Sequence, residues 1–314
     1  MTKPTSYSFG PYDLQEVLVW VPPEKSQDSL FWIVLIHGGA WRDPSITAQS
    51  FAEPAVSKLL SGAAPRLDIP QGKSLAFASI SYRLSPHPDH PQDPVNTPSS
   101  SLRTARHPDH IDDVCSGLET LHRHHRLTVH NYILIGHSCG ATLAFQALKR
   151  CTENAGLAVP PPSAVVGMAG IYHLQDLLDN HKQGPYADVY ASFLKGAFGE
   201  DEVVWNEASP ACWPDHHSDA RMIYAGRTVL LVVADGDDLV EPQQRETMRV
   251  SILGGSKTSD SKDPLVQLDR KEDCNYSEMS VPGGHDEMWL NGERMISVIE
   301  RVLQVLRTSD DTHS

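Results

Sequence analysis

The chain has 314 residues, of which 40% are hydrophobic and 21% charged, a composition typical of a soluble globular protein with a sizeable core. Its 26 Lys and Arg residues against 40 Asp and Glu give a net charge of −14, and a field of that sign repels phosphate backbones and anionic lipid surfaces. We therefore expect neither nucleic acid nor a membrane as a partner.

Two further features predict a location in the cytoplasm. The first residues show no charged segment followed by an apolar one, and no stretch approaches the ~18 consecutive apolar residues of a membrane-spanning helix. The five cysteines, at positions 115, 139, 151, 212 and 274, are odd in number and include no CxxC pair. This arrangement predicts free thiols in a reducing compartment rather than a disulfide framework or a zinc site.

The first half of the chain predicts three strands and a helix. Strands are expected over 14–21, 30–37 and 74–84, and the second of these, LFWIVLIH, is almost wholly apolar, as in a strand covered on both faces. Between 109 and 125, apolar residues recur at positions 111, 114, 118 and 121, which is the spacing of an amphipathic helix.

The second half alternates strands with helices. Strands are predicted over 131–136, 163–170, 228–236 and 276–281, and helices over 139–151, 186–198, 242–253 and 292–307. This alternation indicates an α/β fold with a mostly parallel central sheet and helices on both faces. Two polar stretches, 85–108 and 254–275, are expected to be long surface loops. Neither separates two self-sufficient blocks, so residues 1–314 are expected to form a single domain.

A serine lies between two glycines where one predicted strand meets a helix. The segment Gly136-His137-Ser138-Cys139-Gly140 fits the G-x-S-x-G nucleophile elbow, a tight turn that exposes its serine at the carboxyl edge of the sheet. The backbone N–H of Cys139 is then expected to point to the place where a substrate oxyanion develops. The alternative is an ordinary turn in which Ser138 caps the helix.

A glycine-rich turn also follows the predicted strand over 30–37. There, His37-Gly38-Gly39-Ala40-Trp41 matches the HGG-type loop whose backbone N–H groups complete an oxyanion hole. We expect Gly38, Gly39 and Ala40 to supply these donors, because glycines let the backbone approach a scissile carbonyl closely.

Two later strand ends supply an acid and an imidazole. The segment VVADGDDLVEP contains Asp235, Asp237 and Asp238, of which Asp237 is preferred because D-x-L-V follows the strand, and Asp238 is the runner-up. In SVPGGHDEMW, His285 follows a strand and two glycines and precedes the last helix. The order Ser138, Asp237, His285 is the one expected for a Ser-His-Asp triad on an α/β-hydrolase fold.

With these residues in place, the chain resembles the kynurenine formamidase (arylformamidase) family of α/β-hydrolases, especially its fungal members. The segments that carry the resemblance are HGGAW, SYRLSP, HPDHIDDV, GHSCGA, GIYHLQDLL, DDLVEPQQ and GGHDEMW. The resemblance implies hydrolysis of N-formyl-L-kynurenine to L-kynurenine and formate, in tryptophan degradation towards NAD. It implies neither a metal nor a cofactor, and it suggests a homodimer. The 85–108 stretch departs from the family as an insertion between SYRLSP and HPDHIDDV.

Several side chains near these motifs are weaker candidates for substrate contact. Trp41 and Tyr172 are candidates for the side that accepts the aryl leaving group, whereas Tyr82 is expected to pack in the core. A substrate carboxylate is a possible partner for Arg42 or Arg83, but structural pairing or solvent exposure is the expectation for both.

Three other functions remain as alternatives. A carboxylesterase of the hormone-sensitive-lipase type shares the elbow and an HGG loop, and it is the nearest of them. A metal-dependent amidohydrolase is a second alternative, suggested by the histidines at 87, 90, 107 and 110 and in HRHH (122–125). We expect these histidines on a helix surface and in a loop rather than converging on an ion. A non-catalytic hydrolase-fold protein commonly lacks a triad member, whereas this sequence has all three.

Overall fold

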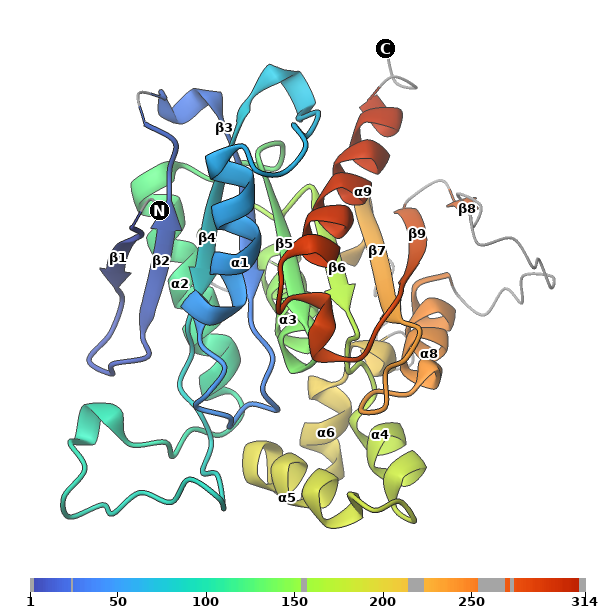
Figure 1. Cartoon of the computed structure of the whole chain (residues 1–314). Helices are drawn as coiled ribbons and strands as arrows, with labels where there is room; N and C mark the ends of the chain where they lie inside the picture. The colour runs from blue at the N-terminus through green and yellow to red at the C-terminus, as the bar shows by residue number, and fades with distance from the viewer. Residues whose placement is uncertain are drawn as a thin grey trace.

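A computed structural model describes residues 3–23, 25–153, 157–213, 223–253, 269–271 and 274–310. Within them, nine strands form one sheet in the order β1-β2-β4-β3-β5-β6-β7-β9-β8 (Figure 1). The strands are β1 (Thr5–Ser8), β2 (Glu16–Trp20), β3 (Leu30–Ile36), β4 (Ser74–Ile80), β5 (Tyr132–His137), β6 (Ala164–Met168), β7 (Arg227–Ala234), β8 (Asp269–Lys271) and β9 (Cys274–Val281). From β4 to β9 the neighbours run parallel, and β1, β2 and β8 add antiparallel edges, which confirms a mostly parallel sheet.

Helices cover both faces of this sheet, as predicted. On one face lie α1 (Ala48–Ser61) and α9 (Glu293–Asp310), and on the other lie α2 (Asp109–His125), α3 (Cys139–Thr152) and α8 (Pro242–Leu253) (Figure 1). Alternate side chains of β3 enter the two apolar cores: Trp32, Val34 and Ile36 on the α2–α3 side, and Phe31, Ile33 and Leu35 on the α1–α9 side. Burial on both faces explains why this strand is apolar throughout.

Shorter helices lie at the ends of the strands. Beyond the carboxyl ends of the parallel strands gather α4 (Leu174–His181), α5 (Ala187–Phe198) and α6 (Glu202–Ala208) (Figure 1). Single 3-10 turns are η1 (Gln27–Ser29), η2 (Pro70–Gly72), η3 (Ser99–Ser101), η4 (Pro210–Cys212) and η6 (Asp286–Met288). No described helix combines the length and the apolar character needed to cross a bilayer.

The elements differ from the sequence-based prediction in a few places. The strand expected over 74–84 ends at Ile80, because Tyr82 turns out of the sheet to contact the backbone of the HGG loop. Helix α1 is not predicted by its sequence, since Pro54 lies in its interior, where proline ordinarily ends a helix. The patterns also do not predict β1, β8, α4 or α6.

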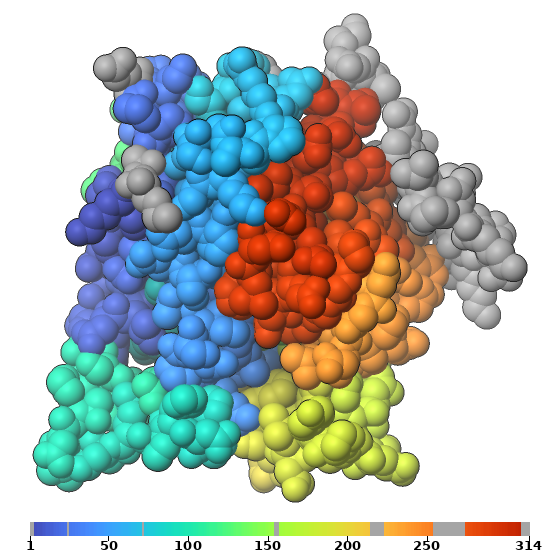
Figure 2. Space-filling model, viewed as in Figure 1, coloured from blue at the N-terminus to red at the C-terminus, as the bar shows by residue number. Residues whose placement is uncertain are grey.

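The predicted loop over 85–108 is fixed by its own hydrogen bonds. The Gln92 side chain donates to the Ser101 carbonyl at 2.8 Å and accepts from the Arg103 N–H at 2.7 Å. At the end of the loop, the N–H of His107 donates to the carbonyl of Ala197 in α5 at 2.7 Å. The loop (teal) and the α4–α5 region (yellow-green) therefore lie next to each other (Figure 2). Most of the second predicted loop, 254–275, lies outside the described residues.

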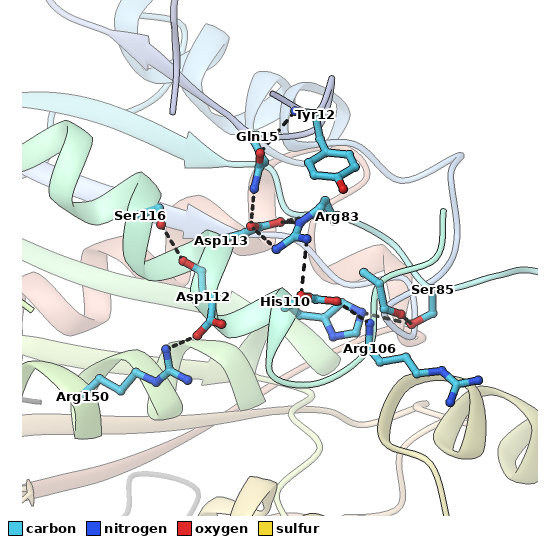
Figure 3. A network of polar contacts seen from close by, with 12 residues as sticks. Tyr12, Gln15, Arg83, Ser85, Arg106, His110, Asp112, Asp113, Ser116 and Arg150 are labelled. Atoms are coloured by element: carbon cyan, nitrogen blue, oxygen red, sulfur yellow. Dashed lines mark hydrogen bonds and ion pairs between the residues drawn. The ribbon is translucent and has the colours of Figure 1, made fainter. Parts of the chain in front are cut away.

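A buried carboxylate joins α2 to the residue before β2 and to the segment after β4 (Figure 3). The Asp113 side chain is 2% exposed, and it accepts hydrogen bonds from Gln15 Nε2 at 2.7 Å and from Arg83 N and Nε, both at 2.8 Å. This bond to Asp113 raises the pKa of Arg83. Arg83 is thus structurally paired, as expected. The preceding residue, Asp112, is half-exposed and contacts Arg150 at 2.5 Å.

We expect Asp113→Asn to lower the free energy of unfolding by about 3 kcal/mol, because it breaks a buried ion pair and leaves Arg83 without its main anion. The matched variant Asp112→Asn breaks a half-exposed pair on the same helix and should cost less than about 1 kcal/mol. Urea unfolding of the two variants measures the difference. An equal loss of unfolding free energy in the two variants would contradict a stabilising role for the buried Asp113–Arg83 pair.

Candidate active site

The turn between β5 and α3 brings three pieces of backbone into close contact. A Cβ on Gly136 would lie 2.1 Å from the Gly140 carbonyl oxygen, and a Cβ on Gly140 would lie 2.4 Å from that of His37. Only glycine fits at either position, because real Cβ contacts are never this short. Ser138, between them, takes φ 55° and ψ −123°, the strained conformation of a nucleophile elbow.

The HGG loop after β3 turns through a run of left-handed residues. Gly39, Ala40 and Trp41 have φ values of 100°, 49° and 57°. The Tyr82 hydroxyl shares its proton between the carbonyl oxygens of His37 at 3.0 Å and Gly38 at 3.1 Å. Strained residues of this kind persist only where neighbouring contacts impose them, and Tyr82 supplies such contacts here.

Cys139 connects the HGG loop to the elbow. Its Sγ accepts the backbone N–H of Trp41 at 3.3 Å and lies 3.6 Å from the Tyr82 hydroxyl. Burial raises the pKa of the Cys139 thiol to about 11, so the sulfur stays protonated. Among the backbone hydrogen bonds of the described chain, none uses the N–H of Gly39, whereas the Cys139 N–H lies against its own thiol. The Gly39 donor therefore remains available to a ligand.

The structure brings His285 and Asp237 together in a buried pair. His285 Nδ1 lies 2.8 Å from Asp237 Oδ2, and the two side chains are 7% and 6% exposed. The other carboxylate oxygen of Asp237 accepts the backbone N–H groups of Leu239 at 3.0 Å and Val240 at 2.9 Å. Asp238, the runner-up, is exposed. The local geometry therefore orients only Asp237 towards the imidazole.

His137, the residue before the serine, contacts His285. His137 Nε2 lies 3.1 Å from the backbone carbonyl oxygen of His285, and the two imidazole ring centres are 4.6 Å apart. Within the described chain, no hydrogen bond links the Ser138 hydroxyl to the His285 ring. Such bonds often tighten only in the substrate complex.

The two aromatic candidates for substrate contact are buried. Trp41 packs against Phe193 and Phe198 of α5, with ring centres 6.2 and 4.8 Å away. The Tyr172 ring packs closely against β6, where a Cβ on Gly167 would meet its hydroxyl at 2.0 Å.

Arg42, the residue after Trp41, is also buried. It donates to the Ser192 hydroxyl at 2.9 Å, and its guanidinium carbon lies 5.7 Å from the centre of the Phe193 ring. No described carboxylate comes within 4.0 Å of it, unlike the closely paired Arg83. The expected structural pairing therefore holds for Arg83, whereas the polar contact of Arg42 is to a neutral hydroxyl.

Sequence reasoning missed several contacts that shape this region. The Tyr190 hydroxyl donates to the Leu239 carbonyl at 2.6 Å and so connects α5 to the turn that carries Asp237. Gln244 Oε1 accepts the N–H groups of Tyr172 and His173, both at 2.8 Å. Gln244 ends the segment DDLVEPQQ, which marks its region of the chain but not its contacts, whereas Tyr190 belongs to none of the quoted segments. For Tyr190 the available signal is its position on a predicted helix.

Potential metal ligands converge at one place in the described residues. His137, His285 and Asp286 offer ligand atoms within 4.8 Å of one another, but His285 Nδ1 is bonded to Asp237. The histidines at 87, 90, 107, 110, 122, 124 and 125 form no such group within the same part of the chain.

The chain has the α/β-hydrolase fold. The fold is similar to that of esterase B from Lactobacillus Rhamnosis (HN001), with a TM-score of 0.65 and 15% identity over 98% of this chain and 87% of that one. A truncated carbohydrate esterase from gut microbiota gives a TM-score of 0.63 and 16% identity over 98% and 97% of the two chains. These identities show the shared fold alone.

More similar sequences define the family. The chain is 37% identical to a kynurenine formamidase-like hydrolase of Fusarium equiseti, over 93% of this chain and 90% of the relative. It is 31% identical to a kynurenine formamidase of Aspergillus versicolor, over 84% and 85% of the two chains. No protein-family model matches it. The chain belongs to the kynurenine formamidase family.

We expect Gly136→Ala to lower the free energy of unfolding by about 3 kcal/mol or more, because the new methyl group meets fixed backbone that cannot move aside. The control is Gly196→Ala in α5, where a Cβ meets nothing within 4 Å. Alanine there should stabilise the helix by up to about 1 kcal/mol. Thermal and urea unfolding test both variants, and a Gly136→Ala protein as stable as the native chain would contradict the close packing.

Proposed function

We propose that the chain hydrolyses N-formyl-L-kynurenine to L-kynurenine and formate, with Ser138, His285 and Asp237 as its catalytic triad. The observation that carries the proposal is the buried His285–Asp237 pair, 2.8 Å apart, beside the strained elbow that presents Ser138. The fungal relatives named as kynurenine formamidases support the choice of substrate.

The proposed reaction has two halves that share one oxyanion site. Ser138 Oγ attacks the formyl carbon while His285 Nε2 takes its proton, and Asp237 stabilises the resulting imidazolium. The imidazolium then protonates the aniline nitrogen as the C–N bond breaks, which releases L-kynurenine. Water adds to the formyl ester with His285 as the base, and formate leaves as Ser138 regains its proton.

The oxyanion forms in both halves and requires backbone donors. We assign this role to the N–H groups of Gly38, Gly39, Ala40 and Cys139. Each donor of this kind is typically worth roughly 3–4 kcal/mol in the transition state. Because a formyl group is small, the acyl side of the site can be tight.

The leaving group is an aryl ring and requires more room. We assign Trp41 and Tyr172 to that side. Because both are buried, we propose that they support the residues that contact the aryl group. Membership of the family indicates a small-molecule substrate. From the same family resemblance we also propose that the protein is a homodimer. A cytoplasmic location is in keeping with Cys115, Cys139 and Cys151, which are buried thiols.

We expect Ser138→Ala to lower turnover of N-formyl-L-kynurenine roughly 10⁴–10⁶-fold, as removal of the nucleophile does in other serine hydrolases. The assay is run in EDTA, because turnover that disappears with chelation would instead indicate a metal-dependent amidohydrolase. A fluorophosphonate label mapped by peptide mass should identify Ser138. Hydrolysis of p-nitrophenyl esters without hydrolysis of the formamide would favour the carboxylesterase alternative.

We expect Asp237→Asn to lower kcat by about 10⁴-fold, because the imidazole loses the carboxylate that fixes its tautomer and balances its charge. The control, Asp238→Asn, changes the neighbouring exposed carboxylate and should leave kcat within about two-fold of native. Steady-state kinetics of the two variants decide between the acids. A larger loss in Asp238→Asn would reverse the assignment.

A further inference from the structure

We propose that His137, the residue before the nucleophile, is a positioning residue that fixes the backbone of His285 relative to Ser138. The proposal rests on the catalytic role proposed for His285 and adds a task for a second histidine. The contact that carries it joins His137 Nε2 to the carbonyl oxygen of His285 at 3.1 Å.

The acceptor determines the tautomer of His137. A carbonyl oxygen can only accept, so Nε2 carries the proton and Nδ1 carries the lone pair. That Nδ1 is buried without a hydrogen-bond partner in the described chain, and it faces Gly38, where a Cβ would come within 2.8 Å. Burial also lowers the pKa of His137 well below its ordinary value, so the ring stays neutral near pH 7.

A neutral ring suits a position beside an imidazole that gains charge. His285 becomes positive when it takes the serine proton, and a second positive ring at a centre distance of 4.6 Å would oppose that step. His137 avoids this conflict because it acts only through its N–H. The two residues thus have different roles. Asp237 orients the imidazole of His285, and His137 fixes the backbone of His285.

The hydrogen bond links residues at the ends of two strands that are not neighbours in the sheet. His137 ends β5 and is joined to Ser138 by one peptide bond, whereas His285 follows β9, and β6 and β7 lie between these strands. The segment before His285 is held on the β7 side, where the N–H of Gly236 donates to the Gly283 carbonyl at 3.0 Å. The bond from His137 adds the direct link between His285 and the strand end that carries Ser138.

Three substitutions of His137 separate this role from simple core filling. Glutamine can place an amide N–H near the position of Nε2, asparagine can place one only near Nδ1, and phenylalanine fills the space without a donor. For each variant we would measure kcat and KM for N-formyl-L-kynurenine, the rate of fluorophosphonate labelling of Ser138, and the midpoint of thermal unfolding.

We expect His137→Phe to lower kcat and the labelling rate about 100-fold with KM within about two-fold, since a misplaced catalytic group can cost that much. His137→Gln should recover both rates to within about five-fold of native, and His137→Asn should stay as slow as the phenylalanine variant. If His137→Phe does not fold, the comparison of glutamine with asparagine decides.

Two results would overturn the proposal: near-native rates in a folded His137→Phe protein, or equal rates in the glutamine and asparagine variants. Labelling keeps this test separate from the substrate assignment. A native chain that labels but does not hydrolyse the formamide would refute the proposed substrate, while the labelling rates of the variants would still judge His137. A native chain that does not label would refute both.

Discussion

The site depends on the close approach of three backbone segments around Gly136 and Gly140. Strand β5, the start of α3 and the end of β3 meet there at distances that exclude any Cβ. This contact leaves Ser138 in a left-handed conformation at the first turn of a helix, and it places the HGG loop beside the elbow. The position of the serine is therefore set by backbone packing in the centre of the sheet, where the strands are buried on both faces.

Hydrogen bonds of side chains and backbone then attach the remaining loops to that centre. Tyr82 and Cys139 fix the HGG loop, and Tyr190 connects α5 to the turn that carries Asp237. The loop over 85–108 contacts the same helix through the backbone bond from His107 to Ala197. Segments from widely separated parts of the sequence thus converge on the carboxyl edge of the sheet (Figure 1). Each is attached by a specific donor and acceptor rather than by apolar contact alone.

The sequence was most informative where local chemistry leaves few alternatives. Apolar runs predicted the buried strands, and glycines next to Ser138 and in the HGG loop marked the two turns, because both demands are expressed within a few residues. Helix α1 was missed because Pro54 argues against it locally, while its packing on the sheet outweighs that cost. The partners of Tyr190 and Gln244 could not be predicted either, since they depend on contacts between distant elements.

The thiol of Cys139 has a consequence for the chemical selectivity of the site. It adjoins the proposed nucleophile, yet it is 0% exposed, its pKa is raised to about 11, and its lone pairs receive the N–H of Trp41. Thiolate, not thiol, is the reactive form of cysteine. An electrophile that enters this region therefore meets a buried, protonated sulfur at the position next to the hydroxyl proposed as the nucleophile. The protein can thus carry a cysteine beside this serine with the sulfur kept in its less reactive form.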